Sequence, residues 1–276
     1  MRTAALVVVL TSVLLAQDPP AGAPPAGVPP ATPPPPPALE NNGRPMVTPY
    51  KCTDEDIHAA GLSCTDDEPC PVYLELSGAA SSGIRLFTVG NIHTANATIF
   101  SILLGSEDNG HTWREVHERI RSSAFDGVQF ADADNGWAGG ILISPLPQDP
   151  FLLRTTDGGK TWRAAPIFTE THYGSIQQFH FDDKAEGALV IDRGSGSGAD
   201  RYESYETHDG GDSWTVKETS TKPLTLKRAV NAPQPEWRVR ADANSRSFQV
   251  EHRQGTRWTG VASFAVNLGV CRPPAE

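Results

Sequence analysis

The chain has 276 residues, and its 33 acidic and 23 basic side chains give a formal net charge of −10. Phosphates carry charge of the same sign, so this balance disfavours general binding to nucleic acid or to anionic lipid. The part after residue 45, roughly 230 residues, is long enough for one all-β domain with a substantial core, and tight turns account for much of the glycine.

The first sixteen residues are typical of a secretory signal peptide. Arg2 is followed by the apolar run Ala4 to Leu15 and by the small residue Ala16, and the run is too short to span a bilayer as a mature helix. We expect cleavage after Ala16 and export to the periplasm or the extracellular space, without integration in the membrane. An uncleaved anchor is the alternative, because Leu14 is tolerable rather than ideal three positions before the cleavage site.

Residues 17–45 are rich in proline, alanine and glycine, with the near-repeats PPAGA, PPAGV and PPATP. This composition favours extended polyproline II structure and cannot build a core. We interpret the segment as a disordered linker that spaces residues 46–276, the folded domain, from the signal. A ligand for a proline-binding domain is the alternative.

The four cysteines are expected to form disulfides, since an exported chain meets an oxidising environment and no CxxC spacing or histidine pair indicates a metal site. Cys70 opens the first strand region and Cys271 closes the last. A bond between them would join the two ends of a circular domain and leave Cys52 with Cys64, although three connectivities are open. A helix is expected only at Asp54 to Ala60, inside a segment that would cap an exposed sheet edge.

One phrase occurs three times at a spacing of about fifty residues, as SEDNGHTW from Ser106, TTDGGKTW from Thr155 and THDGGDSW from Thr207, which predicts stacked and similar β-units. A short carboxylate accepts hydrogen bonds from its own turn, a glycine two places later allows positive φ, and a terminal indole packs between units. We assign these residues a structural role and no catalysis. They are Asp108, Gly110 and Trp113, then Asp157, Gly159 and Trp162, and finally Asp209, Gly211 and Trp214.

Each unit is interpreted as a four-stranded antiparallel sheet. The second would have strands at Gly127 to Ala131, Trp137 to Ile143, Phe151 to Thr155 and Thr161 to Ile167; the other units are Val72 to Val116, Ser175 to Glu218 and Trp237 to Val270. In the last unit EHRQGTRW keeps Gly255 and Trp258 but has Arg253 in place of the aspartate, so we interpret it as a degenerate copy. The prediction is an all-β, propeller-like array of about four such sheets.

The repeated phrase resembles the Asp-box, or BNR repeat, of sialidase-like β-propellers, where it joins the third and fourth strands of a blade. Together with GWAGG at Gly136 to Gly140 it also resembles the photosystem II stability and assembly factor family and related exported bacterial repeat proteins, most strongly across Phe125 to Trp214. The resemblance implies a scaffold used in binding and assembly. Those propellers have seven blades, so either four blades close alone, or further strands or a second chain take part.

A four-stranded meander places the repeated turns at one end of each sheet, and binding loops are therefore expected at the other. Arginine and amphipathic aromatic side chains in those loops suit a polar or anionic protein or glycan partner, although they also suit solvated loops. The candidate binding residues are Arg119, Arg121, His172, Tyr173, Arg193 and Arg201.

A sialidase would need three arginines, a tyrosine activated by glutamate, and an acid. Arg85 and the cluster of Tyr202, Glu203, Tyr205 and Glu206 supply these residue types, but the expected arginine-isoleucine-proline phrase is missing. The sequence has no HExxH, GxSxG or phosphate-binding glycine loop, and DADNG at Asp132 to Gly136 lacks a third calcium ligand. We therefore expect a non-catalytic exported binding or assembly scaffold without cofactor or metal. A sialidase-like glycoside hydrolase or a glycan-binding module is the alternative.

Overall fold

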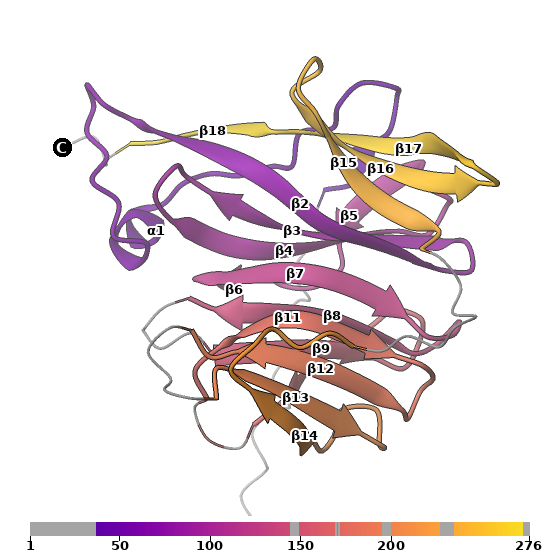
Figure 1. Cartoon of the computed structure of the whole chain (residues 1–276). Coiled ribbons are helices and arrows are strands. Elements are labelled where there is room, and N and C mark those ends of the chain that lie inside the picture. The colour runs from indigo at the N-terminus through magenta and orange to yellow at the C-terminus, as the bar shows by residue number, and fades with distance from the viewer. Residues whose placement is uncertain are drawn as a thin grey trace, which may run out of the picture. The chain divides into compact units, whose positions relative to one another are not determined.

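The computed structural model describes residues 37–143, 149–168, 170, 172–194, 200–226 and 235–272 (Figure 1). The chain divides into two units, Met1–Pro35 and Pro36–Glu276, and the described residues belong to the second. The expected signal peptide and most of the expected linker lie outside the described residues, as do parts of two of the expected binding loops, Ser144 to Pro150 and Arg193 to Arg201. No helix among the described residues is long and apolar enough to cross a bilayer.

Three sheets of the array contain a four-stranded antiparallel meander, in which consecutive strands pair in order. This confirms the all-β, propeller-like prediction. The first meander comprises β2 (Cys70–Ser82), β3 (Arg85–His93), β4 (Thr98–Ser106) and β5 (Thr112–Glu115); the second β7 (Ser123–Phe130), β8 (Gly136–Leu142), β9 (Asp149–Thr155) and β10 (Arg163–Pro166); the third β11 (Ser175–Phe181), β12 (Gly187–Asp192), β13 (Tyr202–Thr207) and β14 (Thr215–Ser220).

The fourth sheet has three strands, β15 (Trp237–Asp242), β16 (Ser247–Gln254) and β17 (Arg257–Ala265). The phrase EHRQGTRW was expected to form a degenerate version of the repeated turn, but it does not. It forms a tight hairpin between β16 and β17 with Gln254 opposite Arg257. Because Arg253 replaces the aspartate, no carboxylate is present to brace the larger turn. The next strand, β18 (Asn267–Cys271), pairs with β2 instead.

Short elements at the N-terminal side connect the first and fourth sheets. β1 (Leu39–Glu40) pairs with β5, and Met46 forms a bridge to Phe264 of β17. The Asn41 side-chain amide donates hydrogen bonds to the backbone carbonyls of Gly110 and Val261 at 2.9 and 2.7 Å. The described fold therefore begins before residue 46. β6 (Ile120–Arg121) pairs with β4, and α1 (Asp54–Ala59) lies where a helix was expected.

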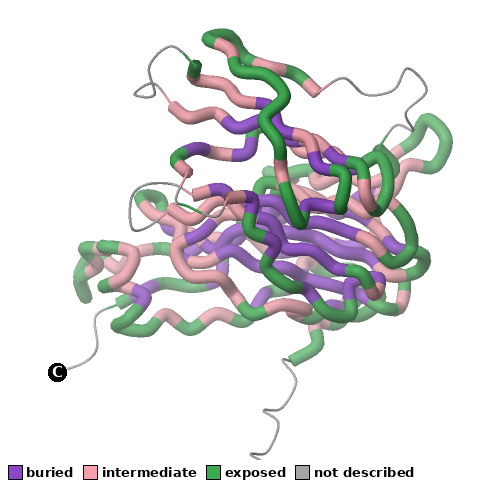
Figure 2. The backbone as a smooth tube through the Cα atoms, turned by 90° about the horizontal axis from the view of Figure 1, so that it is seen from below, coloured by how far each residue is buried: buried purple, intermediate pink, exposed green. Residues whose placement is uncertain are grey.

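The sheets pack face to face in the order β11–β14, β7–β10, β2–β5 and β15–β17 (Figure 1). Large aromatic side chains lie in each interface, and Figure 2 shows that the buried residues gather in the middle of the stacked strands. Trp137 stacks on Phe181 at 3.7 Å between the second and third sheets, and Trp113 meets Phe264 at 5.3 Å between the first and fourth. The fourth sheet thus packs on the first, although it follows the third in the sequence.

Two side-chain amides join neighbouring sheets. Asn91 of β3 accepts a hydrogen bond from the Phe125 amide nitrogen at 2.8 Å and donates one to the Phe125 carbonyl at 3.3 Å. Gln129 of β7 bonds the nitrogen and carbonyl of Phe181 in the same way, at 3.2 and 2.7 Å. Each carboxamide satisfies both backbone groups of one residue, as a peptide unit does in a β-ladder.

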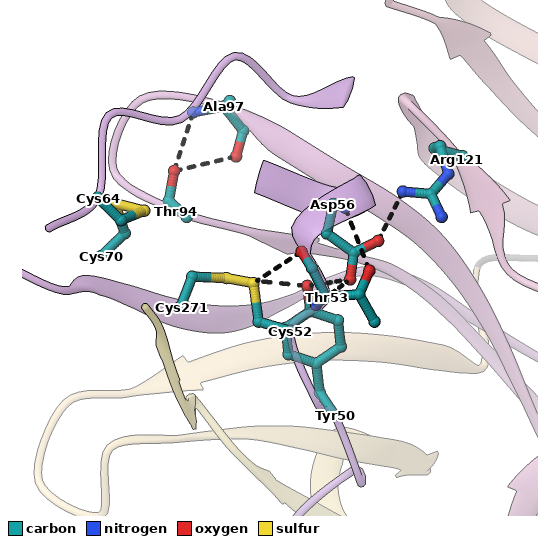
Figure 3. Close-up of a disulfide and its surroundings, with 10 residues drawn as sticks. All are labelled: Tyr50, Cys52, Thr53, Asp56, Cys64, Cys70, Thr94, Ala97, Arg121 and Cys271. Carbon is teal, nitrogen blue, oxygen red and sulfur yellow. Dashed lines mark hydrogen bonds and ion pairs between the residues drawn. A yellow bond between two sulfur atoms is a disulfide. The ribbon is translucent and has the colours of Figure 1, made fainter. Parts of the chain in front are cut away.

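The disulfides are Cys52–Cys271 and Cys64–Cys70 (Figure 3). The favoured pairing of Cys70 with Cys271, and of Cys52 with Cys64, is wrong. Cys271 does lie opposite Cys70 across β18 and β2, but the segment that leads into α1 brings Cys52 to it, and the short loop before β2 closes on itself. The longer disulfide still fastens the N-terminal side of the domain to its last strand.

Candidate functional site

The three repeat turns, Ser106–Trp113, Thr155–Trp162 and Thr207–Trp214, share one hydrogen-bond pattern. In each, one oxygen of the aspartate accepts from the backbone nitrogen four residues later at 2.8 to 2.9 Å, and the other accepts from that residue's hydroxyl at 2.6 to 2.7 Å. The hydroxyl that begins the turn donates to the carboxylate and accepts from the glycine nitrogen. The three turns are therefore equivalent.

These bonds hold the carboxylates in their charged form. Partial burial alone would raise the pKa of Asp108 and Asp157, but the bonds from Thr112 and Thr161 outweigh it and lower both to about 2. Bonds from Ser213 lower the pKa of Asp209 to about 2 as well.

Two of the turns are each contacted by an arginine from the preceding sheet. Arg85 donates to the carbonyls of Asp157 and Gly158 at 3.3 and 3.1 Å. Arg154 donates to the Asp209 carbonyl at 3.3 Å and forms an ion pair with Asp212 at 3.1 Å. Arg85, considered above as a substrate-binding arginine, therefore makes bonds between sheets.

The structure divides the predicted binding residues into two groups. In the first, Arg119 binds Glu115 through two bonds of 3.0 and 2.6 Å and donates to the Pro49 carbonyl. Arg121 binds the buried carboxylate of Asp56 at 2.6 Å (Figure 3). Burial raises the pKa of Asp56, but the bonds from Thr53 and Arg121 outweigh it and lower the pKa. Both arginines thus hold α1 and the segment before it against the first sheet.

The second group lies at the end of the third sheet opposite the repeat turns. His172 and Arg193 converge on Glu203, with nitrogen-to-oxygen distances of 2.8 Å each. Arg201 instead binds Asp192 through two bonds of 2.7 Å. Tyr173, next in sequence to His172, is exposed.

Tyr205 completes the Glu203 cluster with an O–H···O bond of 2.6 Å. This is the tyrosine–glutamate pairing that a sialidase nucleophile would need, but Tyr205 is 5% exposed and packs on Phe168 at 5.1 Å. Burial, and next the hydrogen bond to Glu203, raise the pKa of Tyr205 above its ordinary range. Ready formation of a phenolate nucleophile requires the opposite shift, so this cluster is better suited to positioning loops than to attack on a substrate.

A groove of about 690 Å³ lies between the first strands of the four sheets. β7, β11 and β15 are end strands of their sheets, and β2 pairs with β18 only at its N-terminal end. Backbone edges without a strand partner among the described residues therefore surround the groove. The lining residues are Ser77–Ser81 of β2, Gly127–Phe130 of β7, Phe179 and His180 of β11, and Pro235–Val239 around the start of β15.

This groove was not predicted from the sequence. The sequence feature that accompanies the groove is the run SGAASS at Ser77–Ser82. In this run the alternating pattern of the first part of β2 gives way to small residues at every position. Small side chains leave open the space that leucine or valine would fill. They also allow close approach, since a Cβ on Gly78 would lie 3.0 Å from the Cα of Gly127.

Asp126 lies beside the groove and lines an adjoining cavity of about 540 Å³ with Gln177 and His180. The residue is open to solvent at the surface, yet desolvation by neighbouring protein atoms raises the pKa of its carboxyl to about 6. A carboxyl with this pKa can act as a general acid. The described residues that line the cavity include no second carboxylate.

No family model and no curated protein matches the sequence. Similar solved structures include "YCF48 bound to D1 peptide" (20% identity, TM-score 0.41, 70% of this chain and 56% of that chain) and YCF48 from Cyanidioschyzon merolae (18%, 0.39, 70% and 57%). An α-L-arabinanase of Penicillium chrysogenum complexed with arabinobiose matches at 12% identity and a TM-score of 0.38, over 82% and 66% of the two chains. The chain spans a little over half the length of the YCF48 structures. These likenesses concern the fold.

Proposed function

We propose that this chain is an exported, non-catalytic scaffold that binds an extended segment of a protein partner in the groove between the four sheets. The observation that carries the proposal is the convergence of four strand edges on one groove of about 690 Å³. Such edges offer backbone donors and acceptors to an added strand, and pockets along them select its side chains. The sequence features of a signal peptide and the two disulfides support export.

The walls of the groove are rigid, which favours recognition. Trp237 donates a hydrogen bond to the Ser81 hydroxyl at 2.9 Å and stacks on His252 at 4.5 Å. On the other wall, Gln129 is held by its bonds to Phe181. Because the site is already formed, the protein loses less conformational entropy on binding a ligand than a flexible site would.

Glycoside hydrolysis is the second candidate, and the raised pKa of Asp126 favours it. Glycosidases ordinarily use two carboxyl groups about 5 to 9.5 Å apart. A panel of fluorogenic glycosides tests this candidate, with Asp126→Asn as the control. Turnover by the native chain that the variant loses would support hydrolysis in place of the scaffold.

Binding is tested with an array of extended peptides, followed by fluorescence polarisation on the best binder. Ala79→Trp fills the groove, whereas Ala164→Trp places the same side chain on an exposed position of β10. We expect Ala79→Trp to weaken binding at least about tenfold, or about 1.4 kcal/mol, and Ala164→Trp to leave it unchanged. Thermal melting of both variants checks that they fold. Equal binding by folded variants would contradict the proposal.

Export is tested separately, by N-terminal sequencing of the secreted chain. We expect the mature chain to begin near Gln17. Recovery of a chain that retains Met1 would count against cleavage.

A further inference from the structure

Positive charge is concentrated in the C-terminal segment that contains the fourth sheet. Residues 235–272 carry six arginines against three acidic residues, a net charge of +3 in a chain whose net charge is −10. Arg238 and Arg240 lie two residues apart on β15, so their side chains project from the same face. Glu236 and Asp242 occupy the alternate positions on either side. This face of β15 therefore has the charge order negative, positive, positive, negative.

One buried carboxylate positions both arginines. The Nε atoms of Arg238 and Arg240 donate to the two oxygens of Glu251 at 2.6 and 2.8 Å. Only 7% of the Glu251 side chain is exposed, against 41% and 46% for the two arginines. Burial raises the pKa of Glu251, but its bonds to Arg240 and Arg238 outweigh it and lower the pKa. The carboxylate therefore stays charged and anchors both side chains.

The bonds to Glu251 leave the outer edges of both guanidinium groups available. In the described part of the chain, the terminal amino groups of Arg238 and Arg240 have no further hydrogen-bond partner. Arg238 also lies over the Trp258 ring at 4.3 Å, a contact that holds the guanidinium plane. Arg238, Arg240, Glu251 and Trp258 form what we call the arginine platform.

The arginine platform borders the unpaired edge of β15. Arg238 lines the groove, and β15 pairs only with β16 among the described strands. Side chains of an added strand would stand opposite those of β15, with same-face positions about 7 Å apart. Two acidic side chains of that strand, at positions i and i+2, would thus match the two arginines.

We propose that β15 binds an extended, acidic segment of a partner protein as an added strand, with two alternate acidic residues on Arg238 and Arg240. The inference rests on the proposed function and names the ligand chemistry of the same groove. Glu236 and Asp242 favour basic or neutral residues at the next alternate positions. The complementary pattern is basic, acidic, acidic and basic, each separated by one residue.

The direct test measures fluorescence polarisation of a labelled peptide with that pattern, built on threonine and valine. The matched control has glutamine for each glutamate. We expect the glutamate peptide to bind at least about tenfold more tightly at low salt, and the difference to shrink as ionic strength rises. N-methylation of alternate backbone nitrogens should abolish binding, because an added strand needs them.

Equal affinity of the glutamate and glutamine peptides would overturn the acidic assignment and leave the proposed function standing. Failure of every extended peptide, neutral ones included, would count against the proposed function itself. Competition by polygalacturonate at equal carboxylate concentration, with N-methylation having no effect, would overturn strand addition in favour of an acidic glycan.

Substitutions test whether the peptide binds at the arginine platform. Arg240→Gln leaves Glu251 bound to Arg238. It should lower the affinity for the glutamate peptide about threefold to tenfold and leave the affinity for the glutamine peptide unchanged. The matched control is Arg114→Gln, which removes the same charge from an arginine paired with the exposed Glu107. Arg238→Lys with Arg240→Lys keeps the charge and should weaken binding through loss of the planar contacts. Equal losses in Arg240→Gln and Arg114→Gln would overturn the assignment.

Discussion

The three meanders and the fourth sheet show what one carboxylate does in a repeat. Where aspartate is the third residue of the motif, its two oxygens accept hydrogen bonds from a wide turn, and a fourth strand follows. Where Arg253 stands in that position, the chain makes a tight hairpin and the sheet ends at three strands. The fourth sheet then depends on contacts with the N-terminal segment and with β2, and a disulfide fastens β18, the strand that follows it.

The largest expected effect tests that dependence. Cys52→Ser with Cys271→Ser opens a loop with a sequence separation of 219, and the chain-entropy model predicts a loss of about 5 kcal/mol in the free energy of unfolding. The control pair, Cys64→Ser with Cys70→Ser, opens a loop with a separation of 6 and should cost about 2 kcal/mol. Urea denaturation measures both, and hydrogen exchange should show β18 losing protection first. Equal costs would contradict this account.

A second comparison concerns the tryptophans that end the repeats. Trp113 is fully buried, so Trp113→Ala should lower the free energy of unfolding by about 3 to 5 kcal/mol. Trp258 is partly exposed on the fourth sheet, and Trp258→Ala should cost about 1 kcal/mol. Chemical denaturation of the two variants gives the difference. Similar costs would mean that the fourth sheet packs its indole as the meanders do.

The carboxylate brace itself should contribute less than the indole. Asp157→Ala removes the acceptor for the Thr161 backbone and hydroxyl, and we expect a loss of about 2 kcal/mol. Gln254→Ala, in the hairpin without a brace, should change stability by less than about 0.5 kcal/mol. Thermal unfolding of both variants measures the contrast, which would disappear if the repeat turns were held by packing alone.

The smallest effects are pH-dependent and opposite in sign. The pKa of about 2 at the repeat-turn aspartates means that their contribution to stability is present above about pH 4 and is lost as the pH falls toward 2. Asp126, with a pKa of about 6, stabilises the fold only when protonated, so its contribution is lost as the pH rises through 6.

Asp126→Asn should therefore stabilise the protein at pH 7 by about 1 kcal/mol, after discounting for its solvent exposure, and should have no effect at pH 4. Urea denaturation at the two pH values checks both expectations. Stabilisation that is equal at pH 4 and pH 7 would show that titration is not its cause.

The repeats could be predicted because their cause is local. Asp108, Asp157 and Asp209 bond within their own turns, so spacing in the sequence was sufficient. The disulfides depend on how the segment before α1 lies against β18, which no local pattern records. The groove depends on four strands distant in sequence. Arg119 and Arg121 occur in the expected region. The sequence alone did not show that Arg119 pairs with Glu115 and Arg121 with Asp56.

The bonds of Asn91 and Gln129 to the backbone of the next sheet have a mechanical consequence. If two neighbouring sheets slid past one another, each carboxamide would lose both its donor and its acceptor contact at once. Shear between the first three sheets is therefore resisted at the positions where β7 and β11 border the groove. The length of two amide side chains therefore fixes the spacing of these three sheets, and with it the width of the groove that β2, β7 and β11 line.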